Sequence, residues 1–182
     1  MSIKERLIAA IIAREGGYSN HADDSGGETM YGITVAVARK HGYAGAMRDL
    51  PRVLAERIIA AEYCDPLALD RVERLSPAVA EELADTAVNM GPGIAGQFLQ
   101  RILNVFNLRG SLYSDLAVDG RIGPISLTAL AAYLDHRRRD DGENTLLKAL
   151  NALQGARYVQ LAEAREKDET FVFGWIRNRV VI

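Results

Sequence analysis

A carboxylate at the end of an apolar helical pattern is the first candidate for chemistry. Glu15 precedes Gly16-Gly17, a natural helix stop. It lies three and four residues beyond Ile12 and Ile11, so it continues their apolar stripe. Burial raises the pKa of a carboxyl group and favours the neutral form that a general acid needs. The alternative is that Glu15 turns to water in the last turn of the helix.

A polar segment after this helix offers a second carboxylate, Asp24. The sequence Ser25-Gly26-Gly27 predicts a tight turn, which would bring Asp24 back toward the helix end. Two carboxylates in unlike environments, one buried and one solvated, are the arrangement used for glycoside hydrolysis. Asp24 alone is equally well explained as an Asx-turn that caps this bend.

The remaining candidates have more than one explanation. Asp85 and Asn89 form an i, i+4 polar pair that would face either a groove or solvent. Trp175, the only tryptophan, would stack on a sugar ring or anchor the C-terminus in the core. Cys64, the only cysteine, has apolar neighbours and is expected to be a buried thiol. The histidines have no metal-ligand spacing, so we expect neither a metal site nor a cofactor.

Helix signals define the elements that must position these residues. A Ser-x-x-Glu capping box at 2–5 starts the first helix, and Ser76 caps a helix over 77–90. A short hairpin or irregular β-lobe is predicted within 18–34. Residues 137–142 read as a charged loop before a long helix over about 143–167. We therefore expect a mainly α fold, a helical bundle with one small β-hairpin lobe beside the active-site cleft.

A break at Gly91-Pro92-Gly93 is the best candidate for a domain boundary. It predicts a catalytic region over residues 1–92 and a helical region over 93–182 that packs against the first. The length of 182 residues suits one domain, or a small domain with an added lobe, and suffices for a sizeable core.

Charge and hydropathy limit the partners. The formal net charge of -2 gives no global electrostatic argument for binding nucleic acid or an anionic membrane. No apolar run approaches the roughly 20 residues of a transmembrane helix. The apolar run within 7–13 has no small-residue cleavage site after it, so no signal peptide is expected and synthesis should be cytoplasmic.

Several motifs in order along the chain resemble glycoside hydrolase family 108, bacterial and phage N-acetylmuramidases whose hallmark is a Glu-Gly-Gly-Tyr string. The string stands here at Glu15-Gly16-Gly17-Tyr18. Further matching segments are 24–29, 31–34, 87–92, 99–100 and 119–124. The last two resemble the peptidoglycan-binding region that usually follows the catalytic part, so the resemblance spans nearly the whole chain.

The resemblance implies a lysozyme-like α+β fold and hydrolysis of the β-1,4 bond between N-acetylmuramic acid and N-acetylglucosamine. Glu15 corresponds to the essential acid, which protonates the leaving oxygen. Asp24 corresponds to the carboxylate before the Gly-Gly turn, which either positions water or stabilises an oxocarbenium ion. Thr29 is the nearest match to a water-holding threonine of phage-type lysozymes, one residue short of its spacing. Family members often have an aromatic pair where this chain has Tyr63-Cys64.

Three further residues are expected to line the sugar groove. Tyr18 and Tyr31 would provide faces for sugar packing, and Asn89 an amide for N-acetyl groups. The expected partner is the glycan strand of peptidoglycan, acted on in the periplasm by a monomer. Without a signal peptide, the protein would cross the membrane through a holin, as an endolysin does, or serve a secretion or assembly system.

Two other functions remain open from the sequence. A lytic transglycosylase would use Glu15 without Asp24 and leave a 1,6-anhydro end on the product. A non-catalytic peptidoglycan-binding module would keep the fold without turnover.

Overall fold

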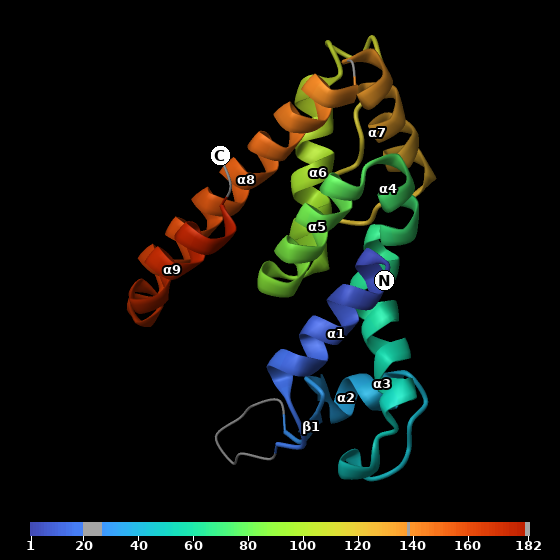
Figure 1. Cartoon of the computed structure of the whole chain (residues 1–182), viewed down its shortest axis with the longest axis vertical. Helices are drawn as coiled ribbons and strands as arrows, with labels where there is room; N and C mark the ends of the chain where they lie inside the picture. Colours follow the sequence, from blue (N-terminus) through green and yellow to red (C-terminus); the bar gives the residue numbers. More distant parts are fainter. Residues whose placement is uncertain (20–26, 138, 181–182) are drawn as a thin grey trace.

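The computed structural model of the protein describes residues 1–19, 27–137 and 139–180. It is mainly helical with a small antiparallel sheet, which confirms the expected fold class (Figure 1). In the part that is described, no helix is long and apolar enough to cross a membrane. The elements follow in the order α1 (Ile3–Glu15), β1 (Thr29–Met30), β2 (Ile33–Thr34), α2 (Val35–Lys40), η1 (Met47–Asp49), α3 (Arg52–Ile59), η2 (Ala60–Cys64), η3 (Asp65–Leu67), α4 (Leu69–Leu75), α5 (Pro77–Met90), α6 (Pro92–Phe106), α7 (Pro124–His136), α8 (Arg139–Ala164), η4 (Glu166–Asp168) and α9 (Glu169–Arg179).

Helix α1 begins and ends where its sequence predicts. Ser2 and Glu5 form the capping box, in which each side chain accepts a hydrogen bond from the backbone N–H of the other residue. The buried face of the helix consists of Ile3, Leu7, Ile11 and Ile12. Packing of this face fixes the axis of α1 and therefore the position of Glu15, its last residue.

The hairpin β1–β2 has a two-residue turn, Tyr31-Gly32. Both residues have positive φ, 55° for Tyr31 and 76° for Gly32, as a type I′ turn requires. Ser19 forms a bridge with Thr29 and so joins the chain after α1 to this hairpin. The turn is thereby held next to the end of α1.

Helix α5 is the centre of the molecule. It packs against α1 and α4 from the N-terminal half and against α6 and α8 from the C-terminal half. The buried apolar residues of both halves form one continuous core. The regions 1–92 and 93–182 thus share packing surfaces, while the proposed boundary at residue 92 stays a prediction.

Helices α8 and α9 form an arm that extends from the body, with α9 folded back along the end of α8 (Figure 1). The expected charged loop at 137–142 is wrong, because α8 begins at Arg139. Asp140 and Asp141 lie in its first turn, where negative charge interacts favourably with the helix dipole. The helix also ends earlier than predicted, at Ala164.

A loop between α6 and α7 is fixed by side chains of α6. The buried Gln100 donates hydrogen bonds to the Asp119 carboxylate at 2.8 Å and the Arg121 carbonyl oxygen at 3.0 Å, and accepts one from the Gly120 N–H at 2.8 Å. At Gly96, an added Cβ would lie 2.1 Å from the Gly120 carbonyl oxygen. The motif at 119–124 therefore docks this loop onto α6.

Candidate active site

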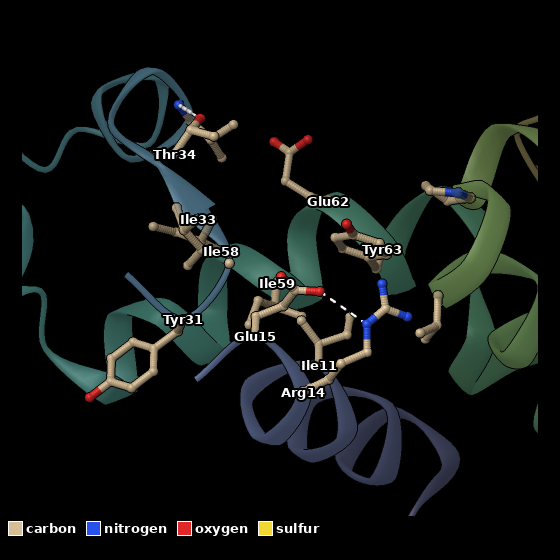
Figure 2. A pocket seen from close by; sticks show the side chains of 14 residues that line it. Ile11, Arg14, Glu15, Tyr31, Ile33, Thr34, Ile58, Ile59, Glu62 and Tyr63 are labelled. Atoms are coloured by element: carbon tan, nitrogen blue, oxygen red, sulfur yellow. Dashed lines mark hydrogen bonds and ion pairs between the residues drawn. The ribbon is translucent and has the colours of Figure 1, made fainter. Parts of the chain in front are cut away.

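A pocket of about 430 Å³ lies where the end of α1, the hairpin, and the segment after α3 meet. Its residues come from α1, the β1–β2 hairpin, α2, α3 and η2, with a small contribution from α5 and α6. Figure 2 shows Glu15 and Arg14 on one side and Glu62 and Thr34 on the other. The lining combines apolar side chains with a few charged and hydroxyl groups, as is typical of ligand sites.

Glu15 lines this pocket but is not buried. Its side chain is 41% exposed, and its Oε1 accepts a hydrogen bond from Arg14 Nε at 3.1 Å. The expected burial is therefore wrong for the free protein, because the last residue of α1 extends past the core that covers Ile11 and Ile12. Gly32 packs directly against it, since a Cβ added there would lie 2.7 Å from Glu15 Cγ.

Glu62 places a second carboxylate in the pocket. Its Oε1 accepts a hydrogen bond from Lys40 Nζ at 2.9 Å and lies 2.6 Å from His41 Nε2. These hydrogen bonds, first from His41 and then from Lys40, lower the pKa of Glu62 below its ordinary value. The pocket thus holds two carboxylates with different partners, Glu15 beside an arginine and Glu62 beside a lysine and a histidine.

The two residues that face the pocket from η2 share an unusual backbone. Residues Ala60–Cys64 form a π-helical turn that continues α3, and Glu62 and Tyr63 both lie on it. Such turns often occur at functional sites. Tyr63 is half-buried and offers an aromatic face to the pocket, whereas its neighbour Cys64 is buried, as expected. Burial raises the pKa of the Cys64 thiol to about 12, so this thiol stays protonated.

Of three other expected groove residues, the structure places one in the pocket lining and two outside it. Tyr31 lines the pocket, with its ring extending away from the Glu15 carboxylate (Figure 2). Tyr18 lies outside the lining, with its ring 5.0 Å from the Arg48 guanidinium carbon. Thr29 is outside it as well, in β1, where it pairs with Thr34.

One expected site residue lies outside the pocket lining, and another belongs to the part of the chain that the structure does not describe. Asn89 is not among the lining residues, and its amide donates to the Asp85 carbonyl oxygen at 2.7 Å and to Asp85 Oδ2 at 3.3 Å. Asp24 lies outside the described residues. The roles assigned to both residues stay predictions.

Sequence reasoning missed Arg14, Thr34 and Glu62 as pocket residues. Arg14 is the neighbour of the candidate acid in the sequence. Thr34 was interpreted only as a helix cap, which it is, but it also lines the pocket. Glu62 carries no local signal, because the packing of α3 against β2 and of η2 against α1 brings it there. Tyr63 had a signal, since it stands at the first position of the expected aromatic pair.

Comparisons with known proteins match one family model to each half of the chain. Residues 8–91 match the family model Glycosyl hydrolase 108, and residues 94–180 match the model described as Predicted Peptidoglycan domain. Among solved structures, the chain resembles the "Structure of Brucella abortus SagA", with 22% sequence identity, 98% of each chain covered and a TM-score of 0.54. At this identity the likeness shows a common fold. No sequence among the curated proteins matches the chain.

Proposed function

The chain carries a glycosyl hydrolase 108 domain followed by a predicted peptidoglycan domain, and we propose that it is an N-acetylmuramidase with Glu15 as its general acid. The bond cleaved is the β-1,4 bond between N-acetylmuramic acid and N-acetylglucosamine. The two domains imply degradation of peptidoglycan. We choose this bond because the motif that contains Glu15 resembles the hallmark of N-acetylmuramidases.

One observation carries the proposal: Glu15 and Glu62 line a single pocket from different elements and have different partners. Glycoside hydrolysis needs one carboxyl group to protonate the leaving oxygen and an anionic carboxylate to assist at the anomeric carbon. Lys40 and His41 favour the anionic form of Glu62. Glu62 therefore suits the anionic role, and Glu15, on the other side, suits the acid.

In the proposed reaction the glycosidic C–O bond breaks as the Glu15 carboxyl group gives its proton to the leaving oxygen. The positive charge that develops on the sugar is stabilised by the anionic side of the pocket, to which Glu62 contributes. A water molecule adds its oxygen to the anomeric carbon and loses a proton to a carboxylate of the site. Asp24 retains its predicted share in this step, as the residue that positions water or stabilises charge.

Because Glu15 is exposed, the substrate itself would have to exclude water from this carboxyl group. A sugar in the pocket would displace the water around this carboxyl group, and removal of water favours the neutral, proton-bearing form of a carboxyl. It would also compete with Arg14 for the carboxyl oxygens.

Turbidity loss of purified cell walls tests the proposal with wild type and Glu15→Gln. The amide has nearly the same shape as the acid but cannot supply the proton, so we expect clearing to fall to the background rate. Glu163→Gln, on an exposed residue of α8, is the matched control and should clear walls as wild type does. Equal clearing by wild type and Glu15→Gln would remove Glu15 from the mechanism.

Mass spectrometry of the soluble products identifies the reaction type. Hydrolysis leaves a reducing N-acetylmuramic acid end, so each cleavage adds one water to the products. Attack by the muramoyl 6-hydroxyl instead of water leaves 1,6-anhydro ends, which as main products would assign the protein to the lytic transglycosylases.

A further inference from the structure

Three pockets of the structure adjoin one another in a row. The pocket beside Glu15 shares Arg14 and Val88 with a second pocket between α1 and α5, of about 290 Å³. The second pocket shares Asp85 and Arg179 with a third, of about 540 Å³, on α9. The three pockets therefore follow one another from the candidate acid, along the α1–α5 contact, to the C-terminal arm.

The second pocket has an apolar floor and charged edges. Its apolar lining comes from α1 and α5, namely Ile3, Leu7, Ala10, Ala84 and Val88. Its charged lining consists of three arginines and two carboxylates, namely Arg6, Arg14, Arg179, Glu81 and Asp85. Each arginine pairs with a carboxylate, Arg6 with Glu81 at 3.1 Å, Arg14 with Glu15 at 3.1 Å and Arg179 with Asp85 at 2.7 Å. A sugar ring has an apolar face and polar edges, so it matches such a floor and rim. The polar edges of the ring would bind to the arginines and carboxylates of the rim, and a lactyl carboxylate would compete with Glu81 for Arg6.

The third pocket presents aromatic faces on a helix without a buried side chain. Phe171 is 55% exposed, and its ring stacks on Trp175 with centroids 6.1 Å apart. Tyr158 of α8 packs against Trp175, at 5.3 Å between ring centroids. Thr170 and Asn178 add polar groups to the same pocket. Aromatic faces beside hydroxyl and amide groups suit the faces and edges of a sugar ring.

An ion pair between α5 and α9 fixes this pocket relative to the groove. Arg179 donates a hydrogen bond to Asp85 Oδ1 at 2.7 Å, and Gln154 of α8 donates to Asp85 Oδ2 at 3.0 Å. Asp85 therefore joins the arm to α5 at the point where the second and third pockets meet.

We propose that the glycan strand extends from the pocket beside Glu15 along the α1–α5 groove and binds to Phe171 and Trp175 on α9. This inference rests on the proposed function, and it names where the strand lies on the rest of the protein. It also gives the predicted peptidoglycan domain, residues 94–180, a specific binding surface. The C-terminal half then acts by holding the same strand that the N-terminal half cleaves.

Steady-state kinetics on glycans of two lengths test this path. The substrates are long, uncrosslinked peptidoglycan glycan strands freed of peptide stems, and a tetrasaccharide prepared from the same strands. The measured quantity is the ratio of the KM for the tetrasaccharide to the KM for the long strands. We expect Phe171→Ala to reduce this ratio about threefold to tenfold, which is the value of an aromatic contact of about 0.5 to 1.5 kcal/mol.

The matched control is Phe173→Ala on the same helix. Phe173 is 74% exposed and does not line the third pocket, so its removal should leave the ratio at the wild-type value. Asn178→Ala is a second pocket variant that leaves the Phe171–Trp175 stack intact, and we expect it to reduce the ratio as well. If the KM ratio of Phe171→Ala and of Asn178→Ala equals that of the control Phe173→Ala, the glycan path is overturned.

The single tryptophan gives a direct measure of occupancy. In Glu15→Gln, which holds the strand without cleaving it, addition of long strands should change the Trp175 emission, and the tetrasaccharide should change it much less. No change with saturating long strands would also overturn the path. If wild type hydrolyses neither substrate, the proposed function itself fails, so the two failures are distinguishable.

Discussion

Replacement of Gly32 by alanine tests whether the hairpin turn positions Glu15. The added Cβ would lie 2.7 Å from Glu15 Cγ and 2.9 Å from Glu15 Cβ. Carbon atoms in contact normally lie about 3.5 to 4.0 Å apart, so Glu15 must retreat by roughly 1 Å. Because its Cβ is attached to the backbone, rotation of the side chain alone cannot remove the second clash.

The expected effect on the reaction is large. Misplacement of a catalytic group by about 1 Å can cost on the order of a hundredfold in rate. We therefore expect kcat on cell-wall glycan to fall about a hundredfold in Gly32→Ala. Gly32 also has a φ of 76°, and an L-residue in the left-handed region costs roughly 1 to 2 kcal/mol of folding free energy.

Gly42→Ala separates the catalytic effect from the backbone effect. Gly42 has a φ of 83°, and a Cβ added there would meet nothing within 4 Å. Both variants should lose about the same stability in urea unfolding, roughly 1 to 2 kcal/mol. Only Gly32→Ala should lose most of its kcat. If the two variants are equally active, the turn does not position Glu15 for the reaction.

Three further predictions follow from charged and buried groups. Burial raises the pKa of Glu82 to about 7 from an ordinary value of 4.5, so the folded protein binds this proton more tightly than the unfolded chain. Stability should fall as pH rises through this window, by up to about 3 kcal/mol. Urea unfolding at pH 5 and pH 8 should show a smaller fall for Glu82→Gln, and equal falls for it and wild type would contradict the assignment. Gln100→Leu leaves the polar groups that Gln100 satisfies without partners and should cost about 2 to 3 kcal/mol, whereas Gln97→Leu, at a partly exposed position of α6, should cost much less by the same measurement. Glu62→Gln should lower kcat on the order of a hundredfold, and Glu56→Gln on the neighbouring α3 should not; unchanged kcat in Glu62→Gln would exclude its carboxylate from the reaction.

The parts of the fold that the sequence predicted correctly depend on local interactions. The capping box at Ser2 and the cap at Ser76 each involve residues within one turn of a helix, so a short stretch of sequence is enough to predict them. The sequence predicted a hairpin or irregular β-lobe within 18–34 but not its turn at Tyr31-Gly32, and the turn predicted at 25–27 lies largely outside the described residues. The start of α8 was missed because a charged segment over 139–142 suits a helix N-terminus as well as a loop.

The composition of the pocket depends on contacts between distant residues and was only partly predictable. Glu15 and Tyr31 were expected there, and both line it. Glu62 was not expected, because the packing of α3 and its π-helical turn decide that this side chain lines the pocket. The exposure of Glu15 was mispredicted for the same reason: helical spacing gives the face on which a residue lies, but not where the neighbouring core ends.

The open pocket and the exposure of Glu15 both fit the polymeric substrate that we propose. A glycan strand has no free end near most of its bonds, so it must enter a site from the side, and the proposed acid stands at such an open site with its side chain 41% exposed. The strand itself must then exclude water from Glu15. Contacts far from the bond that breaks, such as those proposed along α5 and α9, increase the time for which the strand covers Glu15. On this reasoning the C-terminal half contributes to catalysis by keeping the substrate in place over a pocket that the N-terminal half leaves open.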